Sequence, residues 1–249
     1  MRQVPHFLQF ALLGGGRMAR HAAHYLKLLN IPFQQWNRSQ DSDALSRCLE
    51  NSSHVLVLVS DSAIVELTLK AKDLLGLAKS GEKTWVHFSG CLTSPHAIGA
   101  HPLSSFSDSL FDEAEYRQIP FMIETPYKMA ETLPGLPNPE YSIDPLQKPL
   151  YHSLCVLSGN FTTILWAKLF SELTKTFGIP AAAAIPYLRA IFKNLEIHAA
   201  AEGKVPLTGP LARGDKATIK ANLDALGSDP FATIYKAFVK ANQTTGAQP

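Results

Sequence analysis

Glycines near the start of the chain have a spacing typical of phosphate binding. Residues 14–19 read G-x-G-x-x-A, between an apolar run and an amphipathic stretch. In this pattern the first glycine allows a tight turn, the second admits a pyrophosphate, and the small last residue lets helix and strand pack closely. The free N–H groups of the following helix attract an anion. A glycine-rich turn without a ligand is the alternative. We predict that a dinucleotide contacts Gly14, Gly15, Gly16, Arg17, Met18 and Ala19.

The end of the second expected strand bears on the choice of dinucleotide. An acidic residue about 20 positions after the first glycine would bind the ribose of NAD. The chain has Asn37, Arg38 and Ser39 in that region instead. A guanidinium beside two small polar side chains suits a 2′-phosphate, which favours NADP as the cofactor. The alternative is a solvated turn, because these three residue types are common in loops.

Two further loops follow expected strands and carry small or polar residues. Ser60 and Asp61 follow one strand, and Ser89 and Gly90 follow the next. Ligands of open parallel sheets bind beyond the carboxyl ends of the strands, so we expect these four residues to line the nicotinamide side of a cleft. For the Asp61 side chain, capping of the helix that starts near Ala63 is the favoured alternative.

Two of the nine histidines are candidates for proton transfer. His101 is expected in a loop after a strand, and His152 opens the second half of the chain. Reduction of a carbonyl by hydride requires a proton donor, and imidazole titrates near neutral pH. Capping or packing roles are the alternatives. His21 and His24 are expected at the surface, and without a Cys/His cluster or HExxH motif we predict no metal site.

A turn-rich segment near the C-terminus combines one cation with one anion. It reads Leu207–Thr208–Gly209–Pro210–Leu211–Ala212–Arg213–Gly214–Asp215. Asp215 is placed to cap the helix that follows it. Arg213 could bind a substrate carboxylate with two parallel hydrogen bonds, or it could bridge elements of a helical domain.

These residues need a scaffold, and the first half of the chain predicts one. The expected strands are residues 7–13, 32–36, 54–59, 84–88 and 119–124, and the expected helices between them include residues 17–29 and 64–77. The run His54 to Val59 is continuously apolar, which is typical of a strand covered on both faces. Alternation of strand and helix predicts a parallel sheet with right-handed crossovers, so the fold class is α/β with a Rossmann-like domain.

The second half of the chain has helical periodicity. Apolar stripes run through residues 165–173 and 188–195, and the last helices are expected at 217–226 and 231–241. Seven prolines fall between Pro120 and Pro149, so we expect the chain to pass there from one domain to the next. The predicted organisation is a nucleotide-binding domain at residues 1–146 and an all-helical domain at residues 147–249.

The composition excludes several classes of protein. The chain has 249 residues, 46% of them hydrophobic, and a formal net charge of +2. This charge argues against a strongly basic nucleic-acid surface, and the apolar share argues against disorder. The three cysteines form no close pairs, which fits a reducing compartment. No apolar run approaches the ~20 residues of a membrane helix. We expect a soluble, cytoplasmic protein without a nucleic-acid or membrane partner.

Several of these motifs together resemble a known family. The chain is similar to the Rossmann-like proteins with a helical C-terminal domain (DUF2520), which include the PanG-type ketopantoate reductases. The resemblance rests on residues 14–19, His87–Phe88–Ser89–Gly90, His101–Pro102 with Phe106, Tyr151–His152 with Asn160, and residues 207–215. It implies NADPH-dependent reduction of 2-dehydropantoate, a helical domain that dimerises, and an active site in the cleft between the domains.

The resemblance also implies roles for individual residues. His152, or failing it His101, would protonate the alkoxide, and Asn160 would hydrogen-bond the carbonyl oxygen. Arg213, with Thr208 beside it, would hold the carboxylate of a small 2-oxoacid. The better-known ketopantoate reductases use a lysine and a glutamate of their helical domain, and Lys168 does not align with that lysine. The alternatives are a pyrroline-5-carboxylate-type imine reductase and a nucleotide-binding protein without turnover.

Overall fold

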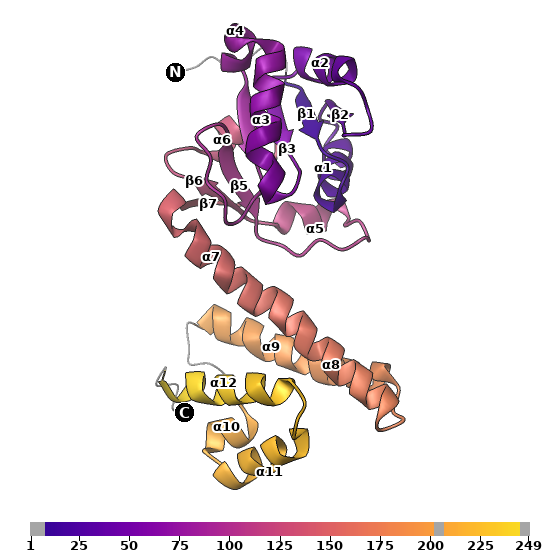
Figure 1. The fold of residues 1–249 in the computed structure, drawn as a ribbon, viewed down its shortest axis with the longest axis vertical. Helices are drawn as coiled ribbons and strands as arrows, with labels where there is room; N and C mark the ends of the chain where they lie inside the picture. The colour runs from indigo at the N-terminus through magenta and orange to yellow at the C-terminus, as the bar shows by residue number, and fades with distance from the viewer. Residues whose placement is uncertain (1–7, 202–206, 245–249) are drawn as a thin grey trace. The chain divides into compact units, whose positions relative to one another are not determined.

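The chain forms two compact units. A computed structural model describes residues 8–201 and 207–244, and Phe7 of the first expected strand lies outside this range. The first unit ends at Thr163 and the second begins at Ile164 (Figure 1). The sequence placed the domain boundary at residues 146/147, before the helix that carries His152. In the structure that helix groups with the first unit.

The first unit is built on one sheet, which has seven strands within the described residues, in the order β2-β1-β3-β4-β5-β6-β7. The strands are β1 (Phe10–Leu13), β2 (Phe33–Trp36), β3 (His54–Val57), β4 (Thr84–His87), β5 (Ile98–Pro102), β6 (Phe121–Glu124) and β7 (Glu140–Ile143). The strands from β2 through β5 pair in parallel, as the alternation of strands and helices predicted. The pairing of β5 with β6 is antiparallel, so the sheet is mixed rather than purely parallel.

Helices cover both faces of this sheet. Phe10 and Leu12 of β1 pack with α1 (Arg17–Leu28) and α6 (Met129–Thr132), whereas Leu13 packs with α2 (Ser42–Glu50) and α3 (Asp61–Leu75). Figure 1 shows α3 lying across the face of the sheet. Every residue of β1 and of β3 is buried, which confirms that the apolar run from His54 belongs to a strand covered on both sides. The short helices α4 (Leu77–Gly81) and α5 (Glu113–Gln118) also belong to this unit.

The proline-rich stretch has a different role from the one predicted. Residues 120–149 contain the sheet strands β6 and β7 together with α6, so the stretch is not a link between domains. Its prolines lie between and at the ends of these short elements, where a missing N–H costs no ladder hydrogen bond. The expectation of a domain crossing here was wrong.

A long helical run follows the sheet and continues into the second unit. It comprises α7 (Lys148–Cys155), the π-helical turn Val156–Phe161 and α8 (Thr162–Lys175). By length and composition the run Pro145–Lys175 could cross a membrane: its mean hydropathy reaches 1.2, and the apolar window is not buried. The sequence analysis expected no such helix. These criteria alone do not separate a membrane span from a helix covered by protein.

The second unit is helical, as predicted. After α8 come a 3-10 turn (Ala181–Ala184), α9 (Ile185–Ala201), α10 (Gly209–Arg213), α11 (Lys216–Leu226) and α12 (Phe231–Thr244). Asp215 caps α11, since its carboxylate accepts a hydrogen bond from the Thr218 N–H at 3.0 Å. This confirms the capping role predicted for Asp215.

Candidate active site

The β1–α1 turn has the geometry of a phosphate cradle. Gly14 has a φ of +150°, and a Cβ placed on it would lie 2.2 Å from the carbonyl oxygen of Leu58. Only glycine fits there. At Gly16, by contrast, a Cβ would meet nothing within 4 Å, and no side chain caps the N-terminus of α1. No side chain therefore satisfies the first N–H groups of α1, which is the condition under which a helix N-terminus can bind an anion.

The packing beneath this turn explains its other small residues. Ala19 is fully buried in the core beside β1, where a larger side chain would separate helix and strand. A Cβ on Gly15 would lie 3.2 Å from the Cβ of Asn37, so the turn after β1 packs against the turn after β2. The structure thus brings two of the predicted cofactor segments together. Met18 packs at the edge of the same core, and Arg17 is exposed.

The turn after β2 is held by its own polar groups. The Asn37 carboxamide oxygen accepts hydrogen bonds from the N–H and the hydroxyl of Ser39, at 3.0 and 2.6 Å. Arg38 lies at the exposed tip of this turn. The Asn37 and Ser39 side chains therefore fix the turn, while Arg38 is the group that could reach a 2′-phosphate.

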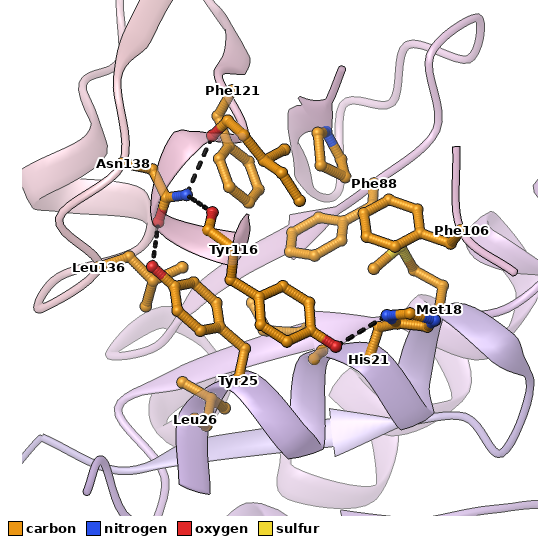
Figure 2. A pocket seen from close by; sticks show the side chains of 14 residues that line it. Met18, His21, Tyr25, Leu26, Phe88, Phe106, Tyr116, Phe121, Leu136 and Asn138 are labelled. Carbon is orange, nitrogen blue, oxygen red and sulfur yellow. Dashed lines mark hydrogen bonds between the residues drawn. The ribbon is translucent and has the colours of Figure 1, made fainter. Parts of the chain in front are cut away.

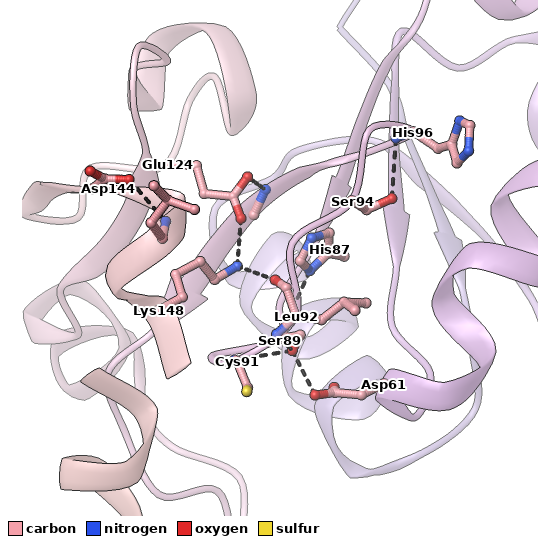
Figure 3. Close-up of polar contacts among 12 residues, drawn as sticks. Asp61, His87, Ser89, Cys91, Leu92, Ser94, His96, Glu124, Asp144 and Lys148 are labelled. Carbon is pink, nitrogen blue, oxygen red and sulfur yellow. Dashed lines mark hydrogen bonds and ion pairs between the residues drawn. The ribbon is translucent and has the colours of Figure 1, made fainter. Parts of the chain in front are cut away.

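A hydrogen bond between Asp61 and Ser89 connects the segments that follow β3 and β4. The Ser89 hydroxyl donates to the Asp61 carboxylate at 2.7 Å and accepts from the N–H groups of Cys91 and Leu92 (Figure 3). The helix cap is Ser60, with no side-chain hydrogen bond, so the expected capping role of Asp61 was wrong. A contact of Ser60, Asp61 or Ser89 with the nicotinamide stays a prediction.

Two histidines meet over Gly90, at the carboxyl end of β4. A Cβ on Gly90 would lie 2.4 Å from Cδ2 of His152 and 3.0 Å from Nε2 of His101. The two imidazole rings are nearly perpendicular, with centroids 5.9 Å apart. His101 was expected in a loop but lies in β5, because Ile98–Pro102 forms a strand of the sheet. The absent side chain of Gly90 is what allows both imidazoles to approach.

Burial and a hydrogen bond fix the protonation state of His101. Its Nδ1 lies 2.8 Å from the hydroxyl of Tyr151. Burial, aided by the nearby His152 and Lys148, lowers the pKa of His101 to about 4. Burial likewise raises the pKa of the Tyr151 hydroxyl, with a further contribution from Cys155. Both groups are therefore neutral near pH 7.

A cavity of about 270 Å³ opens beside these rings. The loop after β5 and the two histidines form one part of its wall. The end of α7 and the π-helical turn form the rest. The lining residues are Leu103, Ser104, Ser105, His101, His152, Cys155, Val156, Ser158, Gly159 and Asn160. The π-helical turn thus brings Asn160 into one cavity with His101 and His152, and the catalytic roles of these three residues stay a prediction. π-Helical turns often occur at functional sites.

A second cavity lies inside the first unit and is apolar. It measures about 30 Å³, and its walls include Met18, Phe88 and Phe106 (Figure 2). His21 borders it with no exposed surface, and its ring nitrogens bond the Tyr116 hydroxyl at 2.8 Å and the Ser107 carbonyl at 2.9 Å. The expectation that His21 is a surface residue was wrong, because α1 turns that face toward α5.

The sequence analysis missed a buried ion pair next to the histidines. Lys148 Nζ lies 2.6 Å from the Glu124 carboxylate, and the two side chains are 1% and 6% exposed. Close by, His87 Nδ1 accepts from the Ser89 N–H, and among the described residues its Nε2 is the buried side-chain atom without a hydrogen-bond partner. Burial, with the charge of Lys148, lowers the pKa of His87 to about 4. No local pattern around Lys148 indicates this burial.

The residues predicted to bind substrate from the C-terminal half lie in the second unit. Thr208 precedes α10 and Arg213 ends it, and their part in substrate binding stays a prediction. Lys168 pairs with Glu172 at 2.8 Å and Asp229 at 2.5 Å, which ties α8 to the start of α12. Within the described residues, no group of three or more His, Cys, Asp or Glu side chains could hold a metal ion.

Comparison with known proteins supports the fold. Residues 119–242 match the family described as "Domain of unknown function (DUF2520)". A Bacteroides fragilis structure described as a "putative NADP oxidoreductase" is 22% identical, with a TM-score of 0.72 over 95% of this chain and 98% of that one. The α/β, Rossmann-like fold with a helical C-terminal region is thereby confirmed. No protein with a curated description matches the chain in sequence.

More distant structures share the same fold. A reductive aminase of Aspergillus terreus, solved with NADPH, is 15% identical, with a TM-score of 0.63 over 97% of this chain and 95% of that one. A Plasmodium falciparum pyrroline carboxylate reductase with bound NADP is 11% identical, with a TM-score of 0.59 over 96% and 97%. At these identities the likeness concerns the fold.

Proposed function

We propose that the protein is an NADPH-dependent reductase of small 2-oxoacids, with 2-dehydropantoate as the first candidate substrate. The observation that carries this proposal is the meeting of His101 and His152 over Gly90, at the carboxyl end of β4 and beside the 270 Å³ cavity. A cavity of this size suits a substrate smaller than a drug-sized ligand. Solved proteins of the same fold are described with NADP or NADPH.

The residues of the first unit fit this cofactor. Bound NADPH supplies the hydride that adds to the carbonyl carbon. The uncapped N-terminus of α1 and the glycine turn bind the pyrophosphate, and Arg38 binds the 2′-phosphate. Ser89 and Gly90, in the loop after β4, would lie on the nicotinamide side.

The protein itself supplies a proton and a hydrogen-bond donor for the substrate oxygen that becomes negatively charged. As the carbonyl carbon gains the hydride, its oxygen takes up the electron pair and needs a proton to become a hydroxyl. His152 donates that proton. Burial keeps His101 neutral, and its ring packs edge-on against the ring of His152. Asn160 donates a hydrogen bond to the same oxygen.

The test is a reduction assay with purified protein, NADPH or NADH, and a panel of 2-oxoacids that includes 2-dehydropantoate. We expect oxidation of NADPH in preference to NADH. His152→Gln should lower kcat by about 10²- to 10⁴-fold, because the proton donor is lost. His96→Gln, which removes an imidazole elsewhere in the same unit, is the matched control. Turnover near the wild-type value in both His101→Gln and His152→Gln would refute these roles.

Imine reduction is the second candidate function. Among the described residues, no lysine or arginine lines the cavity, so its walls offer no permanent cation to an oxoacid. A protonated imine needs less acid catalysis than a ketone. Proteins of this fold include an imine reductase of Streptomyces aurantiacus and the pyrroline carboxylate reductase. Turnover of pyrroline-5-carboxylate that survives His152→Gln would favour this function, whereas NADPH binding with no substrate reduced would indicate a nucleotide-binding protein without turnover.

We also propose that the chain is a homodimer. A row of apolar side chains on α7, the π-helical turn and the start of α8 is exposed: Leu150, Leu154, Leu157, Phe161 and Ile164 are between 44% and 66% exposed. An apolar surface of this extent is typical of an interface. A second copy of the chain covers it without requiring another protein.

A further inference from the structure

We propose that the buried pair Lys148–Glu124 is a positioning device that sets the catalytic face of α7, an inference that rests on the proposed reductase function. Lys148, Tyr151, His152 and Cys155 follow one another at intervals of three, one and three residues. At 3.6 residues per turn these side chains lie on one face of α7. The face carries an ion pair at its N-terminal end and reactive groups along the rest.

Hydrogen bonds connect Lys148, at the start of this face, to three separate segments of the chain. Lys148 Nζ donates to Glu124 on β6 at 2.6 Å and to the Leu92 carbonyl at 2.5 Å (Figure 3). The second carboxylate oxygen of Glu124 accepts from the Gly99 N–H on β5 at 3.0 Å. One cation therefore ties the start of α7 to β5, to β6 and to the loop after β4.

Gly99 shows that this arrangement is built tightly. A Cβ on Gly99 would lie 2.4 Å from both Glu124 Oε1 and Lys148 Nζ. The pair thus occupies the space that any side chain at this position would need. A buried pair with both partners hydrogen-bonded has a defined geometry, and it adds directional precision that apolar packing lacks.

The residues that Lys148 would position lie one turn further along α7. Tyr151 bonds His101, and His152 stands over Gly90 at close contact. A small rotation of α7 would lengthen the Tyr151–His101 bond and withdraw His152 from the cavity. Lys148 is 1% exposed and cannot touch a substrate, so its effect on the reaction passes through these residues.

The central test uses the double variant Lys148→Met/Glu124→Gln. It removes both charges together, because a single substitution would leave one buried charge unpaired and risk unfolding. We expect kcat to fall by about 10- to 100-fold, as small misplacement of catalytic groups does, while the affinity for NADPH stays unchanged. Arg117→Gln/Glu113→Gln, which removes an exposed ion pair of the same unit, should leave both quantities unchanged.

A second readout is independent of turnover. The ¹⁵N NMR signals of the His101 ring report whether Nδ1 keeps its hydrogen bond with Tyr151. We expect this bond to be lost in the double variant and kept in the Arg117→Gln/Glu113→Gln control. If the wild-type protein reduces no substrate, the proposed function fails, while the ring signals still decide whether Lys148 positions the histidines.

The result that overturns the proposal is a folded double variant with unchanged kcat and unchanged His101 signals. If the double variant does not fold, Glu124→Asp decides, since it keeps both charges but shortens the carboxylate and draws it away from Lys148 and the Gly99 N–H. A lower kcat with a weakened His101–Tyr151 bond then supports the positioning role. Wild-type values for both in Glu124→Asp contradict it.

Discussion

At the scale of single residues, Gly90 leaves room for the proposed proton donor, His152, by having no side chain. A methyl group there would lie 2.4 Å from the His152 ring, so Gly90→Ala must displace that ring or the loop. We expect kcat to fall by about 10-fold or more, with NADPH binding retained. The measurement is steady-state kinetics together with NADPH titration.

Gly81→Ala is the matched control for this substitution. Gly81 has an ordinary φ, and a Cβ there would meet nothing within 4 Å. Its kinetics should equal those of the wild type. Equal kinetics in Gly90→Ala as well would show that the approach of His152 to this loop has no part in catalysis.

Two buried neutral histidines make stability depend on pH. The folded state holds the pKa values of His87 and His101 at about 4, below the ordinary histidine value of 6.5. Between these values the unfolded chain binds more protons than the folded one, so the stabilisation is complete above pH 6.5 and is lost as the pH falls toward 4. We expect a loss on the order of 1–3 kcal/mol per histidine by pH 4.

Urea denaturation between pH 4 and pH 8 measures this loss. His101→Gln should reduce the slope of unfolding free energy against pH between pH 4 and 6.5. The slope in His96→Gln should match the wild type. A wild-type stability that is flat over this range would contradict the buried neutral state of both rings.

At the scale of elements, the sequence predicts those whose pattern is strong and local. β1 and β3 are continuous apolar runs, and the glycine motif between β1 and α1 has a defined spacing, so both were predicted correctly. β5 was missed because Ile98–Pro102 contains a histidine and a proline, and β7 because three of its four residues are exposed. These strands exist because neighbours pair with them, which no local pattern records.

The residues of the candidate site also differ in whether the sequence predicts them. His101, His152 and Asn160 were singled out by residue chemistry and by resemblance, and the structure brings them to one cavity. Lys148 and Glu124 were missed, since a buried charge is visible only when the partner that neutralises it is known. Their separation by 24 positions in the sequence hides the pair.

The turn between β2 and α2 predicts the choice of dinucleotide. Arg38→Ala should weaken NADPH binding by about 10-fold or more and leave NADH binding unchanged, because only NADPH carries the 2′-phosphate. Titration of both cofactors measures this difference. Arg47→Ala on α2, also exposed, is the control for loss of a positive charge. An equal effect on NADPH and NADH would refute the assignment of Arg38.

At the scale of the whole molecule, the exposed apolar row on the long helix predicts self-association. Light scattering should give about twice the 27.2 kDa of the single chain. Leu157→Glu places a charge within the row and should shift the mass toward the monomer. Leu77→Glu, at a position that is 94% exposed in α4, is the control. A monomeric wild type that binds lipid vesicles would instead identify a membrane as the cover of this helix.

Charge at the whole-molecule scale is too small to attract the proposed ligands. With a formal net charge of +2, the general field around the protein is weak. Attraction for an anionic cofactor must come from a few placed groups, namely Arg38 and the N-terminus of α1. Binding of NADPH should therefore depend on individual cations rather than on overall charge.

The π-helical turn has a consequence for how the sequence can vary. In a π turn the backbone hydrogen bonds run between residues i and i+5 rather than i and i+4, so the turn holds one residue more than an α-helical turn. Deleting one residue between Val156 and Phe161 would let the segment close into regular α-helical hydrogen bonding, because the extra residue is lost together with the wider turn. The part of the cavity wall that Val156, Ser158, Gly159 and Asn160 form would then come from a narrower helix. Such a deletion should therefore reshape the cavity while the helix stays continuous.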